Sequence, residues 1–422
     1  MKKLYWLSGL AFPLCVPQVV EAEPAAQSGK QPNIIFIMTD QQRGDAVGCS
    51  GNERIITPNI DALAHDGYYF SNAYSATPSS TPARAGLLTG MSPWHHGMLG
   101  YGNVAEHYRY ELPQMLSDCG YLTLGIGKMH WKPQNALHGF DATILDESGR
   151  VESPYFMSDY RKWFQTVAPG KNPDETGIGW NDHAAAIYKL PENLHPTVWT
   201  ADVAVRTIKH YDGGKPLFLK ISFARPHSPY DPPKRILDQY ADIEMEAPAK
   251  GEWSSQIGAE VTDPKAKPDA AFGQFGDEYA KNTKKHYYAA ITFIDEQVGR
   301  IVQALKEKGM YDNTIICFTS DHGDMMGDHN HWRKTYAYEG SSSIPYIVKF
   351  PKDMKTVKPV GSVIENPVEL RDFLPTFIDV AGGKIPADMD GKSLVTLVRD
   401  SQPQWRRWID MEHATCYSDH NY

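Results

Sequence analysis

Short continuous apolar runs alternate along the chain with segments whose apolar residues recur at helical spacing. The run at 33–38, Asn-Ile-Ile-Phe-Ile-Met, is typical of parallel strands that are covered on both faces. In 284–308, apolar residues recur every three or four positions up to Gly309, which indicates a helix. The alternation predicts an α/β fold with a mostly parallel central sheet and helices on both faces. The predicted strands are 33–38, 69–75, 121–127, 217–223, 314–319 and 344–350.

Helices and long loops are expected between these strands. Two excursions, 133–195 and 232–282, are rich in Gly, Pro and Asp, so we expect long loops with short helices there. The predicted helices are 58–65, one that begins at Pro82, 111–118, 198–211 and 284–308, with helical pieces over 368–381.

The N-terminus has the pattern of a secretory signal. Two lysines precede an apolar run that reaches about Val20, and cleavage is expected after Ala22. An ordinary strand or a membrane anchor is the alternative, but the run is short for a bilayer span, and no later segment is long and apolar enough. We therefore expect a signal peptide at 1–22, a flexible lead-in at 23–31, and a periplasmic or secreted mature protein.

Composition narrows the function classes. A hydrophobic content of 41% over 422 residues is that of a globular protein. The net charge of −9 argues against nucleic acid as a partner, and an anionic substrate must be attracted by local positive charge. Widely spaced cysteines argue against a zinc finger or a redox motif. Once Cys15 has left with the signal, up to two disulfides with undetermined pairing are allowed among Cys49, Cys119, Cys317 and Cys416.

Polar clusters follow four of the predicted strands. In open α/β sheets, ligands bind beyond the carboxyl ends of the strands, so these clusters are expected to lie at one edge. Each cluster contains residue types that bind metals or transfer protons, and together they predict a composite site. The four clusters are Asp40-Gln41, Lys128 with His130, His227 with Asp231, and Asp321-His322.

Two carboxylates among these clusters indicate a metal site. Asp40 and Asp321 at one sheet edge would repel each other unless a cation lies between them. Gln41 adds a neutral oxygen and His322 a nitrogen, so calcium or magnesium is expected, with the identity left open by the unusual histidine. The alternative is that each aspartate caps a turn. A zinc site in the histidine-rich run 328–331 is not favoured, because that run lacks helical i, i+4 spacing.

The stretch 79–90, Ser-Ser-Thr-Pro-Ala-Arg-Ala-Gly-Leu-Leu-Thr-Gly, predicts an anion site at a helix N-terminus. Ser80 lies at that helix start and is the candidate nucleophile, with Arg84 one turn later. A Ser-His-Asp triad is not indicated, because no G-x-S-x-G motif is present. The alternative is a buried helix that carries a solvent-facing arginine.

Cations and imidazoles elsewhere supply the remaining chemistry. Lys128 and Lys334, with Arg84, are candidates to hold a tetrahedral oxyanion. His130 and His227 are candidates for general base and general acid. Taken singly, solvated lysines and structural histidines are the alternatives.

These motifs resemble one known family. The stretch from Ser80 to Gly90 resembles the signature of the type I, formylglycine-dependent sulfatases of the alkaline phosphatase superfamily, which is Cys or Ser, any residue, Pro, a small residue and Arg, then Leu-Leu-Thr-Gly. Further matching motifs occur in the family's order and together span about 32–350. They are Asp40-Gln41, Gly127-Lys128-Met129-His130, Pro226-His227, Ser320-Asp321-His322-Gly323 and Lys334.

The resemblance implies a specific chemistry for a sulfatase that is similar to arylsulfatases. Ser80 would be oxidised to formylglycine, whose hydrate attacks sulfur in line. His227 would protonate the leaving alcohol, and His130 would help to deprotonate the second hydroxyl, which expels sulfate. A sulfated serine has no second hydroxyl, so plain serine would not turn over.

The resemblance also implies the ligands of the site. Arg84, Lys128 and Lys334 would hold the sulfate oxygens and stabilise the aldehyde hydrate. One divalent cation, usually calcium with magnesium as the alternative, would be bound by Asp40, Gln41, Asp321, His322 and the group derived from Ser80.

Three features depart from the commonest family pattern. Ser80 stands where many members have Cys, which implies a radical-type maturing enzyme that acts before export. Gln41 and His322 replace Asp and Asn, a combination similar to members that hydrolyse choline sulfate or phosphonate monoesters. A phosphonate monoester or phosphodiester hydrolase is therefore the alternative activity, and an inactive sugar-sulfate binder is a third hypothesis if Ser80 is never oxidised.

The resemblance further implies the domain organisation and the substrate class. We expect a catalytic domain at 32–390 and the beginning of a small C-terminal α+β subdomain at 391–422, with its first strand at 405–412. Secretion favours a sulfated carbohydrate, or another small sulfated molecule, as the substrate. The loops at 133–195 and 228–282 are expected to shape the leaving-group pocket.

Overall fold

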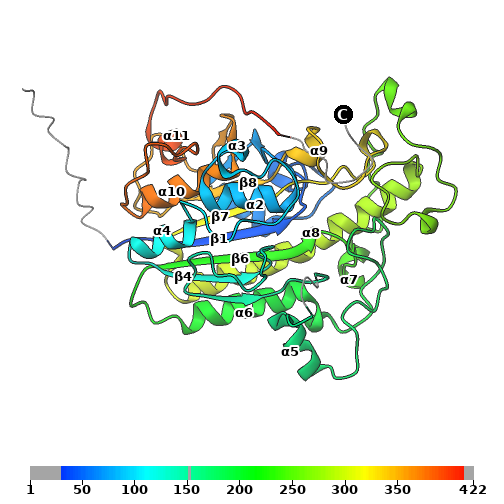
Figure 1. Ribbon diagram of the computed structural model, residues 1–422, viewed down its shortest axis with the longest axis horizontal. Coiled ribbons are helices and arrows are strands. Elements are labelled where there is room, and N and C mark those ends of the chain that lie inside the picture. Colours follow the sequence, from blue (N-terminus) through cyan, green and yellow to red (C-terminus); the bar gives the residue numbers. More distant parts are fainter. Residues whose placement is uncertain (1–29, 151–153, 413–422) are drawn as a thin grey trace, which may run out of the picture. The chain divides into compact units, whose positions relative to one another are not determined.

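The structure is a computed structural model that describes residues 30–150 and 154–412. The expected signal peptide and nearly all of the lead-in lie outside the described residues. Within them, the main sheet has eight strands in the order β5-β4-β6-β1-β7-β8-β2-β9, and β10 pairs with β3 in a second sheet (Figure 1). The strands are β1 (Asn33–Asp40), β2 (Tyr68–Phe70), β3 (Ala73–Tyr74), β4 (Leu122–Gly127), β5 (Ala142–Leu145), β6 (Leu217–Pro226), β7 (Thr314–Ser320), β8 (Tyr346–Lys349), β9 (Val363–Ile364) and β10 (Val368–Glu369).

Helices cover the main sheet on both faces. The five strands from β5 to β7 run parallel, and β8 pairs antiparallel with both of its neighbours. The α/β fold with a mostly parallel sheet is therefore confirmed. The helices are α1 (Pro58–His65), α2 (Ser80–Thr89), α3 (Pro93–His96), α4 (Leu112–Asp118), α5 (Asp159–Val167), α6 (Pro196–His210), α7 (Lys234–Leu237), α8 (Asp277–Glu307), α9 (Glu339–Ser342), α10 (Phe373–Val380) and α11 (Val395–Arg399).

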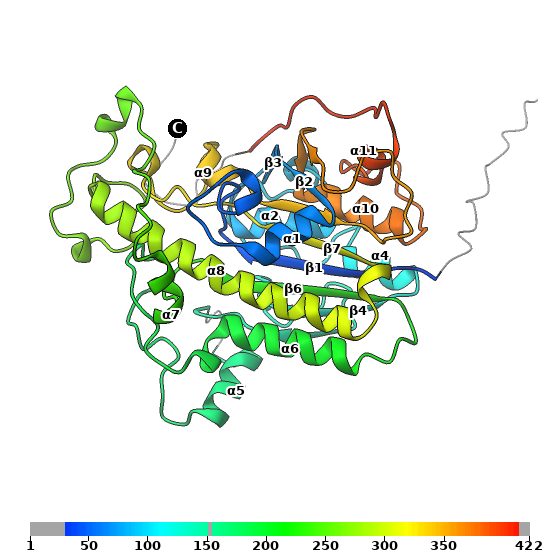
Figure 2. The same cartoon turned by 180° about the vertical axis from the view of Figure 1, so that it is seen from behind.

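Strand β1 shows why its run is continuously apolar. Ile34, Phe36 and Met38 pack on one face with α2, α4, α10 and α11, whereas Ile35 and Ile37 pack on the other with α1, α6 and α8. Figures 1 and 2 show these helices on opposite sides of the sheet. Because successive side chains of a strand point to opposite faces, a strand buried on both faces is favoured by consecutive apolar residues such as 34–38.

Several predicted boundaries were wrong. Helix α2 begins at Ser80, two residues before the predicted start at Pro82, so Ser80 lies within the first turn. Helix α8 begins at Asp277, seven residues before 284, because its first two turns are mostly polar. The predicted strand 69–75 is divided into β2 and β3, and strand β5 was not predicted.

The C-terminal part differs from the expectation of a first subdomain strand. Residues 405–412 form no strand, since a strand needs a pairing partner, and the Glu412 backbone N–H instead meets the Ala76 carbonyl at 2.8 Å. Helix α11 packs with α10 in the main core. The boundary expected at residue 390 stays a prediction.

Two further expectations concern thiols and membranes. Cys49, Cys119 and Cys317 have free thiols, so these three form no disulfide, and Cys416 lies outside the described residues. None of the helices in the described chain combines the length and the apolarity that crossing a bilayer requires.

Candidate active site

The carboxyl ends of β6, β1 and β7 meet at one edge of the sheet. The pairing of β1 with β6 runs to Asp40 beside Pro226, which brings His227 next to Asp40, and the His227 N–H donates to the Asp40 carbonyl at 3.0 Å. The pairing of β1 with β7 runs to Thr39 beside Ser320. Gly127 at the end of β4 lies beside Ser222 of β6, so Lys128 follows at the same edge. The strand register therefore brings together residues of all four predicted polar clusters.

Asp40, Asp321 and His322 form a compact buried group. One ligand-type atom from each residue lies within 4.8 Å of the other two, and none of the three side chains is exposed. Among the described residues, these three form the group of His, Cys, Asp or Glu side chains that could hold a metal ion. Two carboxylates this close require positive charge nearby.

Arg84 and Lys128 provide that charge. Arg84 reaches Asp40 Oδ2 through Nη2 at 2.9 Å and Asp321 Oδ2 through Nε at 3.0 Å, and Lys128 Nζ lies 2.7 Å from Asp40 Oδ2. Burial alone would raise the pKa of Asp40, but Lys128, His227 and Arg84 outweigh it and hold that pKa well below its usual value. Asp40 is therefore ionised. Its Oδ1 is buried without a hydrogen-bond partner in the described structure, as expected of an oxygen that binds a cation.

Each nitrogen of the Arg84 guanidinium has an acceptor. Its remaining donor, Nη1, binds the Lys128 carbonyl at 2.8 Å and Ser222 Oγ at 3.2 Å, and its side chain has no exposed surface. The solvent-facing arginine considered from the sequence is therefore wrong. The contacts support a role in bracing the two aspartates and do not turn Arg84 toward a sulfate group.

His322 is oriented as a ligand. Its Nδ1 lies 2.9 Å from the Gly323 carbonyl, which can only accept, so Nδ1 carries the proton. Burial lowers the pKa of His322, so the ring is neutral and Nε2 has a free lone pair. Ser80 Oγ lies 2.9 Å from this Nε2, which places the candidate nucleophile beside the two carboxylates.

Gln41 adjoins the group through a fixed amide. Its Nε2 donates to Asp324 Oδ2 at 2.5 Å, which orients Oε1 toward Lys334 Nζ at 2.9 Å, and its backbone N–H donates to Asp321 Oδ1 at 3.0 Å. Asp324 also accepts from the Tyr230 hydroxyl at 2.7 Å. Sequence reasoning missed Asp324, although it lies only three residues after Asp321.

His130 is held by a carboxylate that sequence reasoning also missed. Glu147 Oε1 accepts the backbone N–H groups of Met129 and His130 at 2.7 and 2.8 Å. The backbone of His130 has a φ of 66°, a conformation that non-glycine residues rarely adopt. Both ring nitrogens of His130 are buried without a hydrogen-bond partner in the described chain. Burial raises the pKa of Glu147 to about 7.

His227 and Asp231 are separated in the structure. His227 Nδ1 lies 3.1 Å from the Ser228 carbonyl, so Nδ1 donates there. Burial, then the charge of Lys334, lowers the pKa of His227 well below its usual value. Asp231 instead forms a buried ion pair with Arg225 at 3.0 Å, so only His227 of this cluster joins the site.

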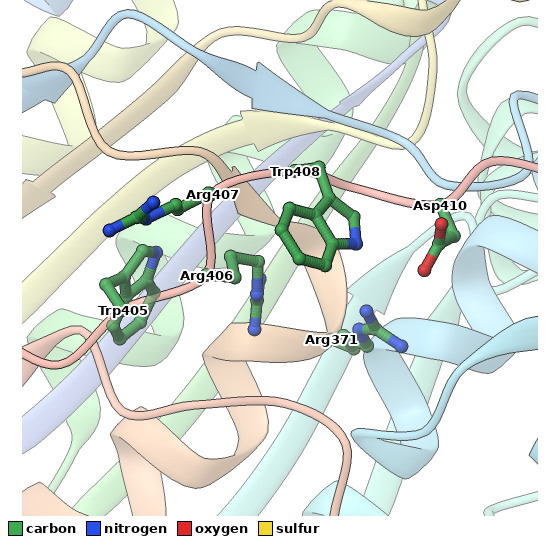
Figure 3. A pocket seen from close by; sticks show the side chains of 6 residues that line it. All are labelled: Arg371, Trp405, Arg406, Arg407, Trp408 and Asp410. Atoms are coloured by element: carbon green, nitrogen blue, oxygen red, sulfur yellow. The ribbon is translucent and has the colours of Figure 1, made fainter.

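A pocket of about 460 Å³ lies apart from these residues, in the C-terminal part (Figure 3). Arg406 stacks on Trp405 and binds both oxygens of Asp372 at 2.6 Å, so its charge is already neutralised. None of the predicted catalytic or metal-binding residues lines this pocket. Its lining residues are Arg371, Trp405, Arg406, Arg407, Trp408 and Asp410.

Comparison with known proteins identifies the family of this chain. Residues 32–383 match the model of the Sulfatase family. The chain belongs to the sulfatase family. This sulfatase is 40% identical to an arylsulfatase of Clostridium perfringens (strain 13 / Type A), over 93% of this chain and 83% of that protein. It is therefore a sulfuric ester hydrolase, and its family generally uses a divalent metal ion and formylglycine.

Two solved structures share the sulfatase fold. The phosphonate monoester hydrolase of Agrobacterium radiobacter aligns with a TM-score of 0.76 and 26% identity, over 89% of this chain and 79% of that one. A protein solved in complex with its substrate D-glucosamine-2-N,6-O-disulfate aligns with a TM-score of 0.70 and 25% identity, over 89% and 82%. The superfamily expected from the sequence is thus confirmed.

Proposed function

We propose that this sulfatase hydrolyses the sulfate ester of a carbohydrate, using formylglycine derived from Ser80 and one divalent cation, most simply calcium. The observation that carries the proposal is the 2.9 Å contact between Ser80 Oγ and His322 Nε2, beside two buried aspartates. This contact supports a role for Ser80 beside the expected metal ligands.

The donor set fits an oxygen-preferring cation. Asp40, Asp321, His322 and residue 80 would hold it, with the Gln41 oxygen beside them. The unpartnered, ionised Oδ1 of Asp40 supports this fit. A bound cation would stabilise negative charge on the oxygens of residue 80 and of the sulfate group. Formylglycine would supply a hydrated aldehyde, whose two hydroxyls permit attack and later release at one carbon.

The other side chains have distinct roles in this proposal. Lys128 and Lys334 hold sulfate oxygens, and Arg84 keeps Asp40 and Asp321 in place. His227 donates a proton to the leaving oxygen from Nε2. The negative charge of bound sulfate near Lys334 favours the protonated ring, because it offsets the cation that lowers its pKa. His130 accepts a proton from the group at residue 80.

The substrate class and the cellular location of the enzyme also form part of the proposal. A structural neighbour was solved with a sulfated glucosamine as its substrate, which supports a sulfated sugar here. The pattern at 1–22 supports export to the periplasm or beyond, with a radical-type enzyme that oxidises Ser80 beforehand. The catalytic part is proposed to be 32–390.

Mass spectrometry of the peptide that contains Ser80 tests the central step. In protein from its own host we expect a mass about two units below that of serine, the loss of two hydrogens. Ser80→Ala should abolish turnover while thermal unfolding changes little, because the side chain lost is small. Unmodified serine in a protein that hydrolyses sulfate esters, or activity in the alanine variant, would contradict the proposal.

A phosphonate monoester or phosphodiester hydrolase is the second candidate, favoured by the alignment with the Agrobacterium radiobacter enzyme. Rates on aryl sulfate, phenylphosphonate monoester and phosphodiester substrates separate the two. A higher kcat/KM on sulfate supports the first proposal, and a higher value on the phosphorus esters supports the second.

A further inference from the structure

Three aromatic rings form a partly exposed cluster, here called the ring cluster: Trp253, His329 and Tyr338. Trp253 stacks on His329 with centroids 4.7 Å apart and on Tyr338 at 5.8 Å, with interplanar angles of 24° and 19°. His329 and Tyr338 lie 4.8 Å apart. Trp253 and Tyr338 each keep 39% of their surface exposed. The Trp253 ring is thus roughly parallel to both other rings, whereas the His329 and Tyr338 rings are tilted by 42° to each other.

The ring cluster is built by two segments that hold each other rigidly. Ser254 Oγ contacts His329 Nδ1 at 3.1 Å, and Asn330 Nδ2 donates to the Ser254 carbonyl at 2.6 Å. The His329 backbone N–H donates to the Ala249 carbonyl at 2.7 Å. His329 and Asn330 both have positive φ, of 53° and 62°, which costs energy unless such contacts fix it.

The same segment leads directly into the catalytic edge. Lys334 Nζ donates to Gln41 Oε1 at 2.9 Å, and the Thr335 N–H donates to the carbonyl of Pro78, two residues before Ser80. Tyr338 is four positions after Lys334 along the chain, so their Cα atoms are at most about 14 Å apart. In both cartoon views, β1 and β6 point toward the side of the molecule that carries α9, which begins right after Tyr338 (Figures 1 and 2). The ring cluster therefore lies within reach of a group joined to a sulfate at Lys334.

Rings held rigid, stacked and partly exposed beside a reaction centre suit a ligand with a flat apolar face. A pyranose ring has such a face of C–H groups, with hydroxyls at its edge.

We propose that the ring cluster is a sugar-binding subsite, in which Trp253 and Tyr338 stack against a pyranose of the substrate on the leaving-group side. The inference rests on the proposed function, since it needs sulfate to be held at Lys334. It makes Trp253 a specificity residue, which acts on binding of the sugar and takes no part in the chemistry.

The test compares Trp253→Ala and Tyr338→Ala with wild type on three kinds of ester. These are a panel of sulfated pyranoses, an alkyl sulfate without a ring, and 4-nitrophenyl sulfate. Trp94→Ala is the matched control, because Trp94 is 47% exposed on α3 and is outside the ring cluster. Thermal unfolding and the mass at residue 80 confirm that each variant is folded and oxidised.

We expect the two variants to lose about tenfold or more in kcat/KM on the best pyranose sulfate, mainly through KM, and to keep the alkyl sulfate rate. Trp253→Phe should recover part of the loss. The inference is overturned by equal losses on pyranose and alkyl esters, by a loss confined to the aryl ester, or by pyranose esters that are no better than the alkyl ester in wild type. If no sulfate ester at all is hydrolysed, the proposed function fails first, and the wild-type rates alone reveal it.

Discussion

Replacing Glu147 by alanine should disable His130 without contact to the reacting atoms. Glu147 accepts two backbone N–H groups, and a hydrogen bond to a charged group contributes about 1.5–3 kcal/mol. Strain at a residue with positive φ is about 1–3 kcal/mol, comparable to one of these bonds. Without the carboxylate, the backbone of His130 is free to relax, and its ring moves. A displacement of about 1 Å costs on the order of 100-fold in rate, so kcat should fall by about that factor with little change in KM.

Glu147→Gln is the matched control. The glutamine oxygen can accept the same two N–H groups, so we expect kcat within about tenfold of wild type. The two variants also separate the effect of the Glu147 charge on stability from the effect of its hydrogen bonds on the position of His130. Because burial raises the pKa of Glu147 from 4.5 to about 7, the unfolded carboxyl loses its proton at lower pH than the folded one. Stability should therefore fall as pH rises from about 4.5 to about 7, and this contribution should disappear in the glutamine variant.

Steady-state kinetics on 4-nitrophenyl sulfate, with thermal unfolding and the mass at residue 80, measure these effects. The decisive assay adds Glu147→Ala to a His130→Ala background. If Glu147 acts through His130, the second change should cost little there, although it is costly alone. Additive losses, or a glutamine variant as poor as alanine, would refute the reasoning.

Two further changes test the charges beneath the site. Arg84→Lys should weaken calcium binding by about 10–100-fold, because lysine cannot bridge Asp40 and Asp321 as the planar guanidinium does. Calorimetry on protein of known mass at residue 80 measures this affinity. Unchanged affinity would show that the bridge is not needed for calcium binding. Burial lowers the pKa of Lys220 from 10.5 to about 7, so between these pH values the unfolded chain binds one proton more than the folded chain and stability rises with pH. Lys220→Met should therefore raise the melting temperature at pH 7 and flatten its rise between about pH 7 and pH 10.5. An unchanged pH slope would contradict this.

The parts of the fold that the sequence predicts are those with local periodicity. Strand β1 is buried on both faces, and its apolar residues 34–38 form the continuous run that is typical of such strands. Strand β5 at the sheet edge has exposed residues among its four and no apolar run, so only pairing with β4 defines it. The first turns of α8 are mostly polar, and the α8 residues that pack in the two larger clusters beside the sheet begin at Tyr287, so the apolar spacing does not reveal where the helix begins.

Some residues of the site can be predicted from the sequence for the same reason, and others cannot. Asp40 ends β1, and Asp321 and His322 directly follow β7, so the direction of the strands alone brings them to one edge. The positions of Glu147 and Asp324 depend on loops whose path is set by tertiary contacts, and no spacing rule reports them.

Arg84 belongs to a motif that is visible in the sequence, but its contact partners cannot be predicted from that motif. Its place in the signature is visible in the sequence, yet its partners are 44 and 237 residues away. Two aspartates whose oxygens lie within 4.8 Å of each other would repel each other in a buried site, so the protein needs a fixed cation there even before a metal binds. The guanidinium supplies this charge from the same helix that carries Ser80. The spacing of Ser80 and Arg84 along α2 therefore sets the position of Ser80, the proposed nucleophile, relative to the carboxylates, which is a physical reason for the two residues to form one motif.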